Sequence, residues 1–243
     1  MPCWLDNQAK VFVQKLKHEN ADTILHVFCG QFDLVFWLLV WNCAVMYAIV
    51  LSWMNIGSDF LQTTYGYSHG TANALLTIPY SLAGVLQPIW GFLSDKVGMR
   101  SQSLFVSSLL FCAAHYVLGW VRMDDDPLWI PIVALIMLGM GYSVFTAVIW
   151  PCYPLVVPPR AIGTAYGIPT SGYNLILTIF YVLVGVVTSS GNGTDKYQNV
   201  QWLLGGTSVS TVLTTLLLWL MDKRTGWRLN PPASAEYDEL DAF

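Results

Sequence analysis

Charge is the first thing that this sequence has little of. Asp, Glu, Lys and Arg together make up 11% of the 243 residues, against about 25% in an ordinary soluble domain. The alternation of apolar and polar residues that is typical of membrane barrel strands is also lacking, so helices are the remaining way to satisfy backbone polar groups in lipid. We therefore predict an all-α fold, a polytopic transmembrane helical bundle surrounded by membrane lipids.

Sets of residues that carry catalysis or hold metals are lacking as well. The histidines are scattered, and none has a metal-ligand spacing to another His, a Cys or a carboxylate. His115 lies inside a long apolar run, where it could relay protons or simply bond to a neighbouring helix. We predict no catalytic residue, no metal, no cofactor and no nucleic-acid partner, and therefore no enzyme.

What the sequence does have is long apolar blocks. Hydrophobic residues make up 55% of the chain, and they gather in blocks of about 20, the length that a helix needs to cross a hydrocarbon core of about 30 Å. The six predicted spans cover about 32–55, 71–93, 101–121, 128–157, 161–187 and 200–221. They form one transmembrane domain over 32–221, between a cytosolic segment over 1–31 and a disordered cytosolic tail over 222–243. The first thirty residues lack the apolar core and cleavage site of a signal peptide, so we expect the first span to direct its own insertion.

The basic residues predict the orientation of these spans. With both termini in the cytosol, nine of the eleven Lys and Arg residues are cytosolic, and only Arg122 and Lys196 are outside. The opposite loops carry mostly aspartates. Asn192 begins an Asn-Gly-Thr acceptor for N-glycosylation, which the same orientation places in the lumen.

The loop between the second and third spans has a distinctive pattern that runs from Gly91 to Arg100. It includes Asp95, which could accept hydrogen bonds from a helix N-terminus, and Gly98, which we expect to bracket a tight turn together with Gly91. A generic basic turn would explain neither the carboxylate nor both glycines. The pattern resembles the G-x-L-x-D-x-x-G-x-R loop of the major facilitator superfamily, in which it follows the second helix of each six-helix half. We predict a conformational role for Gly91, Asp95, Gly98 and Arg100.

The fourth and fifth spans carry residues that suit a moving helix pair. Pro151 should bend the fourth span near its cytosolic end, together with Pro154, because proline removes a backbone hydrogen bond. Gly163 and Gly167 lie on one helix face and allow another helix to approach closely, and Thr164 can bond across such a contact. We predict a gating role for Pro151, Gly163, Thr164 and Gly167.

The block from Trp150-Pro151 through the Val-Val-Pro-Pro-Arg and Gly-Thr-Ala-Tyr-Gly stretches to Asn174 is similar to the second half of the lysosomal dipeptide uniporter branch of the superfamily. The resemblance covers most of residues 36–221. It implies half of a twelve-helix fold and a uniporter that exports dipeptides from the lysosome by alternating access. It also implies two partners, the other six-helix half or a second chain, and a glycosylated lysosomal accessory protein. The family's charged anchors for peptide termini belong mainly to the first half, so none is carried onto this chain.

Polar and aromatic residues well inside the spans are the candidates for a solute pathway. A buried amide or hydroxyl in lipid needs a partner, which is either another helix or a ligand. Trp150 is the best candidate, since an aromatic side chain beside a proline bend can both line a pocket and close it. The full set is Asn42, Tyr47, Tyr80, Gln87, Trp150, Tyr153 and Asn174.

The last residues suggest an address. Tyr237 and Leu240 fit the Tyr-x-x-hydrophobic signal that clathrin adaptors bind, in a polar and acidic tail. This favours a lysosomal or endosomal membrane, and a simple solvated tail is the alternative. Two further functions remain open from the sequence: transport of another solute, such as a sugar or an organic anion, and a non-transporting membrane scaffold or accessory subunit.

Overall fold

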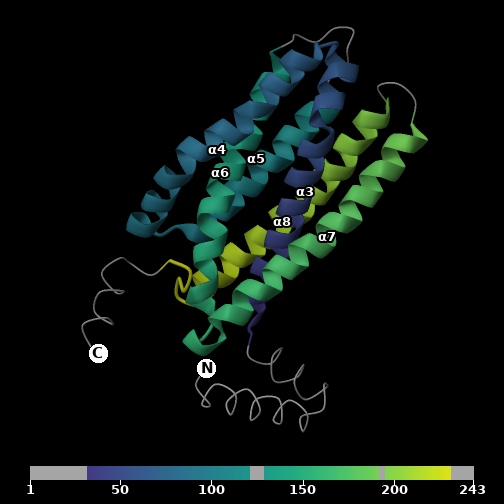
Figure 1. Ribbon diagram of the computed structural model, residues 1–243. Helices are drawn as coiled ribbons and strands as arrows, with labels where there is room; N and C mark the ends of the chain where they lie inside the picture. Colours follow the sequence, from purple (N-terminus) through teal and green to yellow (C-terminus); the bar gives the residue numbers. More distant parts are fainter. Residues whose placement is uncertain (1–31, 121–128, 192–194, 231–243) are drawn as a thin grey trace, which may run out of the picture. The chain divides into compact units, whose positions relative to one another are not determined.

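The computed structural model describes residues 32–120, 129–191 and 195–230, and this part of the chain consists of helices joined by short turns, without a strand. Six of its helices are long and apolar enough to cross a membrane, which confirms the all-α prediction. The elements are α3 (Leu34–Tyr65), α4 (His69–Val97), α5 (Arg100–Trp120), α6 (Ile130–Val156), the short 3-10 helix η1 (Pro159–Ala161), α7 (Ile162–Ser190) and α8 (Asp195–Arg224) (Figure 1).

Several helices extend beyond the predicted spans, because apolar composition marks only the part of a helix that lies in hydrocarbon. Helix α3 continues ten residues past the predicted end at 55, through a polar last stretch in which the Gln62 side chain donates to the Ser58 carbonyl oxygen at 3.2 Å. Helix α8 begins at Asp195, and an acidic residue in a first turn interacts favourably with the helix dipole. Its other end continues to Arg224, so residues 222–224 are helical rather than part of a disordered tail.

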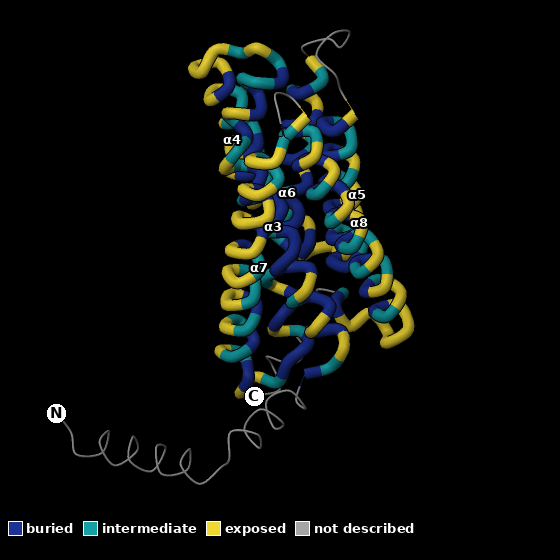
Figure 2. Tube along the Cα trace, turned by 90° about the vertical axis from the view of Figure 1, so that its right-hand side faces the viewer, coloured by how far each residue is buried: buried dark blue, intermediate teal, exposed yellow. Residues whose placement is uncertain are grey.

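Helix α3 lies in the middle of the six helices, and most of its residues are buried (Figures 1 and 2). Its Asn42 accepts a hydrogen bond from Thr214 of α8 at 3.2 Å. Its Trp53 ring lies 6.4 Å, centroid to centroid, from the His115 ring of α5. Helices α4 and α7, by contrast, are largely exposed along their length in Figure 2.

A buried polar seam joins α5 to α8. Its members recur every seven residues on each helix and are all at most 2% exposed: Ser101, Ser108 and His115 on α5, and Gln201, Ser208, Thr215 and Asp222 on α8. The bonded pairs are Ser101 with Asp222 at 2.8 Å, Ser108 with Thr215 at 2.8 Å, and His115 with Gln201 at 2.9 Å. A seven-residue repeat keeps one seam of a helix facing its partner, so these pairs fix the register of α5 against α8. The His115 imidazole thus bonds to a neighbouring helix.

Candidate functional site

A cluster of aromatic side chains lies where α3, α6 and α7 meet, and most of it is only half-buried. Trp150 of α6 donates its indole N–H to the hydroxyl oxygen of Tyr47 on α3 at 2.9 Å. The Trp150 ring stacks on Tyr166 of α7 with centroids 6.1 Å apart and an interplanar angle of 25°. The Tyr47 ring lies 4.9 Å from that of Tyr173, also on α7. We call Tyr47, Trp150, Tyr166 and Tyr173 the aromatic face.

Helix geometry explains why these rings come together. Tyr166 and Tyr173 are seven residues apart, so they stand on the same side of α7. Tyr47 comes from the central helix and contacts a residue on each neighbour, which makes it the centre of the cluster. Each of the four side chains combines a flat apolar ring, which packs against its neighbours, with a hydroxyl or an indole N–H that can form hydrogen bonds.

The prolines of α6 expose backbone oxygen beside this face. Pro154 has no N–H, so the carbonyl of Trp150 lacks its partner four residues on. The Tyr166 hydroxyl donates to that carbonyl oxygen at 3.5 Å, a long bond. Pro151 removes a second bond of the same kind one turn earlier. The carbonyl of Trp150 is therefore bonded by one side chain of α7 in place of a backbone N–H of its own helix.

The aromatic face carries no charge. Among the described residues, the Asp, Glu, Lys and Arg side chains of helices α3 to α8 lie toward the helix ends. A solute at this face would meet rings, hydroxyl groups and an indole N–H, and no ionic partner. The arrangement suits contact with variable, uncharged or aromatic groups of a solute, because aromatic walls with a few polar atoms are typical of small-molecule sites.

The other predicted pathway residues fall into two groups. Asn42 and Tyr153 are at most 1% exposed. Asn42 donates to the Leu38 carbonyl oxygen at 2.9 Å, and Tyr153 donates to that of Leu39 at 3.3 Å. The structure therefore places these two in helix contacts within this chain, and Tyr153 backs the aromatic face from behind.

The second group is exposed and lies on the two outer helices. Tyr80 and Gln87 are on α4, and Asn174 is on α7, where its amide donates to the Thr170 carbonyl oxygen at 2.8 Å. They share the exposed sides of these helices with further polar and small residues: Asn73, Thr77 and Gly84 on α4, and Gly163, Gly167, Ser171 and Thr178 on α7. We call these two sides the polar flanks.

The predicted turn forms between α4 and α5. Gly98 has a φ of +73°, which a residue with a Cβ rarely adopts, and its N–H donates to the Ser94 carbonyl oxygen at 2.9 Å. The Arg100 guanidinium pairs with the Asp95 carboxylate at 3.0 Å. Asp95 therefore binds a side chain at the start of α5 instead of helix backbone groups. Gly91 lies inside α4 and does not bracket the turn, which is a correction to the predicted pair of turn glycines.

The predicted close helix approach at Gly163 and Gly167 is not made within the described chain. A Cβ at either position would meet nothing within 4 Å, and Thr164 beside them is half-buried. Close approach occurs instead at Gly139 of α6, where a Cβ would lie 2.9 Å from the Cα atom of Pro79 on α4. The α7 glycines leave a smooth surface open to another partner.

Three of the predicted site residues, Asn192, Tyr237 and Leu240, lie outside the described residues. Sequence reasoning missed Tyr166 and Tyr173, although their spacing of seven was a usable signal for one helix face. It also missed Asn230 and the buried Asp222, for which no local pattern gave a signal.

Comparison with known proteins gives a consistent result. The family model described as Major Facilitator Superfamily matches residues 38–238. The chain is similar to the lysosomal dipeptide transporter MFSD1 of Homo sapiens, with 26% identity over 227 residues that cover 93% of this chain and 47% of the relative. The corresponding protein of Danio rerio is 26% identical over 184 residues, 76% of this chain and 39% of the relative. The chain spans about half the length of these relatives or less.

Solved structures share the fold. A crystal structure of the peptide transporter POT gives a TM-score of 0.67 at 17% identity, covering 85% of this chain and 42% of that one. The xylose transporter XylE from E. coli gives 0.62 at 15% identity, covering 86% and 58%. The six helices correspond to half of a twelve-helix transporter fold.

Proposed function

Because the chain belongs to the Major Facilitator Superfamily, we propose that it supplies the second six-helix half of a lysosomal uniporter that exports dipeptides by alternating access. The chain is a multi-pass integral membrane protein chain of a transporter family. The observation that carries the proposal is the uncharged aromatic face, set between two polar flanks that none of the described residues covers.

The polar flanks support a second six-helix half as the partner. Amides, hydroxyls and bare glycine backbone are poor surfaces for lipid, since buried polar groups need partners and lipid offers none. Small residues on a helix also allow a neighbouring helix to approach closely in a membrane. The relatives are about twice as long as this chain, which leaves room for six more helices in the complete transporter. In this arrangement the aromatic face is one wall of a central path.

A dipeptide suits that wall. The relatives named above are dipeptide transporters, and a dipeptide presents variable side chains together with an amide that can accept and donate hydrogen bonds. The aromatic face offers rings for the side chains and hydroxyls for the amide. The charged termini of the peptide would be bound by the other half, because the described residues of this half place no charge at the face.

The test is counterflow of labelled dipeptides into proteoliposomes that contain the chain assembled with the complementary six-helix half. We expect uptake of dipeptides, and no uptake of xylose or of dicarboxylates under the same conditions. Uptake without any ion gradient, and without movement of protons, is expected for a uniporter. Uptake of a sugar or an organic anion in place of dipeptides would reject the substrate class, and no uptake of any solute would favour a scaffold.

Orientation is part of the proposal. One end of the helices, which we call the basic end, carries Lys96, Arg100, Arg160, Lys223, Arg224 and Arg228, with Asp95 and Asp222 among the acidic residues near it. By the positive-inside rule this end faces the cytosol. The opposite end, with Asp59, Asp195 and Lys196, then faces the lumen, as does the predicted acceptor Asn192.

A gel-mobility experiment checks this orientation. Treatment with peptide-N-glycosidase should increase the mobility of the chain expressed in animal cells, by the mass of about one glycan. An Asn192→Gln variant should already run at the faster position and should not respond to the enzyme. Reaction of a tag inserted at residue 193 with a cytosolic reagent would contradict the orientation.

A further inference from the structure

The chain does not leave the bundle where α8 ends. Residues 225–230, which we call the fold-back segment, turn back toward the helices through Gly226 and Trp227, with φ values of +83° and +64°. The Trp227 N–H donates to the Asp222 carbonyl oxygen at 2.8 Å, and the Asn230 N–H donates to that of Trp227 at 2.9 Å. Leu229 is fully buried as a result.

Asp222 is the anchor of this segment. Its side chain is 1% exposed and accepts three hydrogen bonds, from the Leu229 N–H at 2.8 Å, the Asn230 amide at 2.6 Å and the Ser101 hydroxyl at 2.8 Å. A buried carboxylate is tolerated only when such donors satisfy it. Two donors come from the fold-back segment and one from α5, so Asp222 binds the segment to the start of α5.

The fold-back segment also binds the residue that pairs with Asp95. The Asn230 side-chain oxygen accepts a hydrogen bond from the Arg100 backbone N–H. The Leu229 carbonyl oxygen accepts a second, weaker bond from the Arg100 guanidinium at 3.4 Å. Even the turn glycine takes part, since a Cβ on Gly98 would lie 3.4 Å from the Asn230 Cβ. The backbone and the side chain of Arg100 are both held from the same segment.

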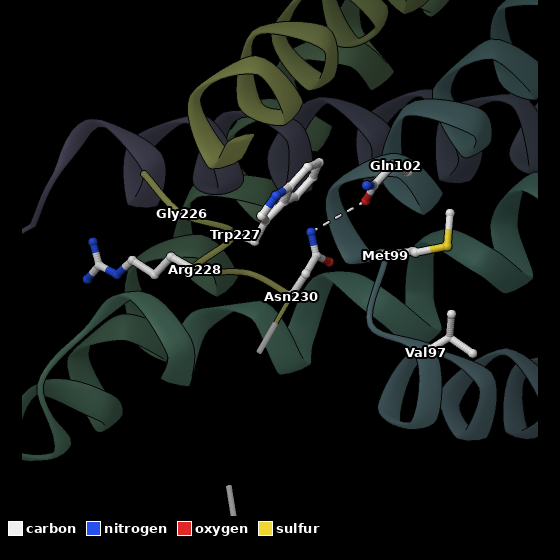
Figure 3. A pocket seen from close by; sticks show the side chains of 7 residues that line it. All are labelled: Val97, Met99, Gln102, Gly226, Trp227, Arg228 and Asn230. Carbon is white, nitrogen blue, oxygen red and sulfur yellow. Dashed lines mark hydrogen bonds between the residues drawn. The ribbon is translucent and has the colours of Figure 1, made fainter. Parts of the chain in front are cut away.

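A third contact ties the segment to the helix that carries Trp150. Arg228 donates to the Val156 carbonyl oxygen at 3.0 Å, in the last turn of α6. Figure 3 shows Asn230 directed toward Gln102, with Trp227 nearby and Arg228 extended the other way. A hollow of about 570 Å³ lies between the segment and the turn residues Val97 and Met99. The segment therefore contacts the turn mainly through Asn230.

We propose that the turn between α4 and α5 acts as a gate, and that Asp222 and Asn230 are its positioning residues: through the fold-back segment they hold Arg100 where its guanidinium pairs with Asp95, and they join the turn to the end of α6. The proposal rests on the proposed transport function, because a gate needs a transported solute. Its physical content is a set of contacts among three elements at the basic end. Loss of one contact should loosen the turn without touching the aromatic face.

The test uses the full chain in lipid nanodiscs and compares Asn230→Ala with wild type by hydrogen–deuterium exchange. We expect exchange of the Arg100 and Leu229 amides to accelerate by about tenfold or more, as loss of a bond in a charged network implies. Ser101→Ala also removes one donor to Asp222 but leaves the Asn230 side chain bonded to the Arg100 N–H, so it should give a smaller increase at Arg100. Asn199→Ala, an exposed asparagine at the other end of α8, is the matched control and should change nothing.

Transport separates positioning from mere local order. In the counterflow assay, Asn230→Ala should lower the turnover rate several-fold and leave the KM for the dipeptide unchanged. Unchanged exchange at Arg100 would overturn the contact, and faster exchange with unchanged turnover would overturn the positioning role. Absence of counterflow in the wild-type assembly would count against the proposed function instead, since the exchange measurement does not depend on it.

Discussion

Trp150→Ala will lower counterflow of dipeptides by about tenfold to a hundredfold, equivalent to roughly 1.4 to 2.8 kcal/mol of lost interaction. Trp150 is the residue through which the aromatic face is assembled, since it bonds to Tyr47 on α3 and stacks on Tyr166 of α7. Its removal takes away one indole donor and a large apolar surface, and it frees the Tyr166 ring to move. The measurement is initial counterflow rate against dipeptide concentration, at matched amounts of reconstituted protein.

Two variants make this result specific. Trp150→Phe keeps an aromatic ring and removes the N–H, so it should lose only the part of the effect that the bond to Tyr47 carries, about threefold to tenfold. Trp129→Ala removes an exposed tryptophan at the N-cap of α6, the end of the helix away from Trp150, and should leave transport near the wild-type rate. Equal losses in Trp129→Ala and Trp150→Ala would contradict a specific role for the aromatic face.

Gly167→Leu will lower transport by more than tenfold while leaving the fold of this half intact. Gly167 is exposed on α7, and a Cβ there would meet no atom of the described residues within 4 Å. Leucine should even favour the helix by about 1 kcal/mol relative to glycine. Any loss must therefore come from a partner that approaches the polar flank, and small residues at such contacts cannot be enlarged without separating the helices.

The matched control for this variant is Gly206→Leu. Gly206 is also an exposed glycine in a membrane helix, α8, and a Cβ there also meets nothing within 4 Å. It lies away from the polar flanks, so we expect normal transport. Co-purification of the complementary half with a tagged chain reports the same contact directly, and should fall for Gly167→Leu only. Normal transport and normal co-purification of Gly167→Leu would show that the flank of α7 is not an interface.

Local composition was enough to predict the six helices, because each apolar block is long and is separated from the next by polar turns. It could not place their ends. Polar residues such as Gln62 and Asp195 continue helices outside the hydrocarbon, where hydropathy carries no signal. The turn at Gly98 could be predicted, because a glycine between Asp95 and Arg100 is a pattern of neighbouring residues. Gly91 lies inside α4, so the pattern that marks the turn does not extend back to it.

The aromatic face was only partly predictable. Trp150 and Tyr47 stood out as aromatic residues inside spans. Tyr153 is also an aromatic residue inside a span, yet it lies fully buried against α3. Which side of a helix faces its neighbours depends on packing among all six helices, and periodicity is weak when nearly every position is apolar. For the same reason, the sequence could not show that Asn42 is buried in contacts within this chain.

The basic end shows the clearest limit of sequence reasoning. The stretch after 221 is polar and charged, which predicts an unfolded tail, but residues up to Asn230 are held in place by bonds to residues over a hundred positions away. Asp222 looks like a solvated helix-end residue in the sequence and is a buried acceptor in the structure. Long-range hydrogen bonds of this kind leave no local pattern.

The central claim is that the aromatic face is one wall of the path by which a solute crosses the membrane, and accessibility of a cysteine at that face tests it most directly. We expect Tyr173→Cys, in the assembled transporter, to react with a membrane-impermeant thiol reagent added from either side. Saturating dipeptide should slow the reaction by more than tenfold. Ser190→Cys, exposed at the far end of the same helix, should react from one side only and at the same rate with or without dipeptide. Reaction of Tyr173→Cys that dipeptide leaves unchanged, or that occurs from one side alone, would contradict the claim.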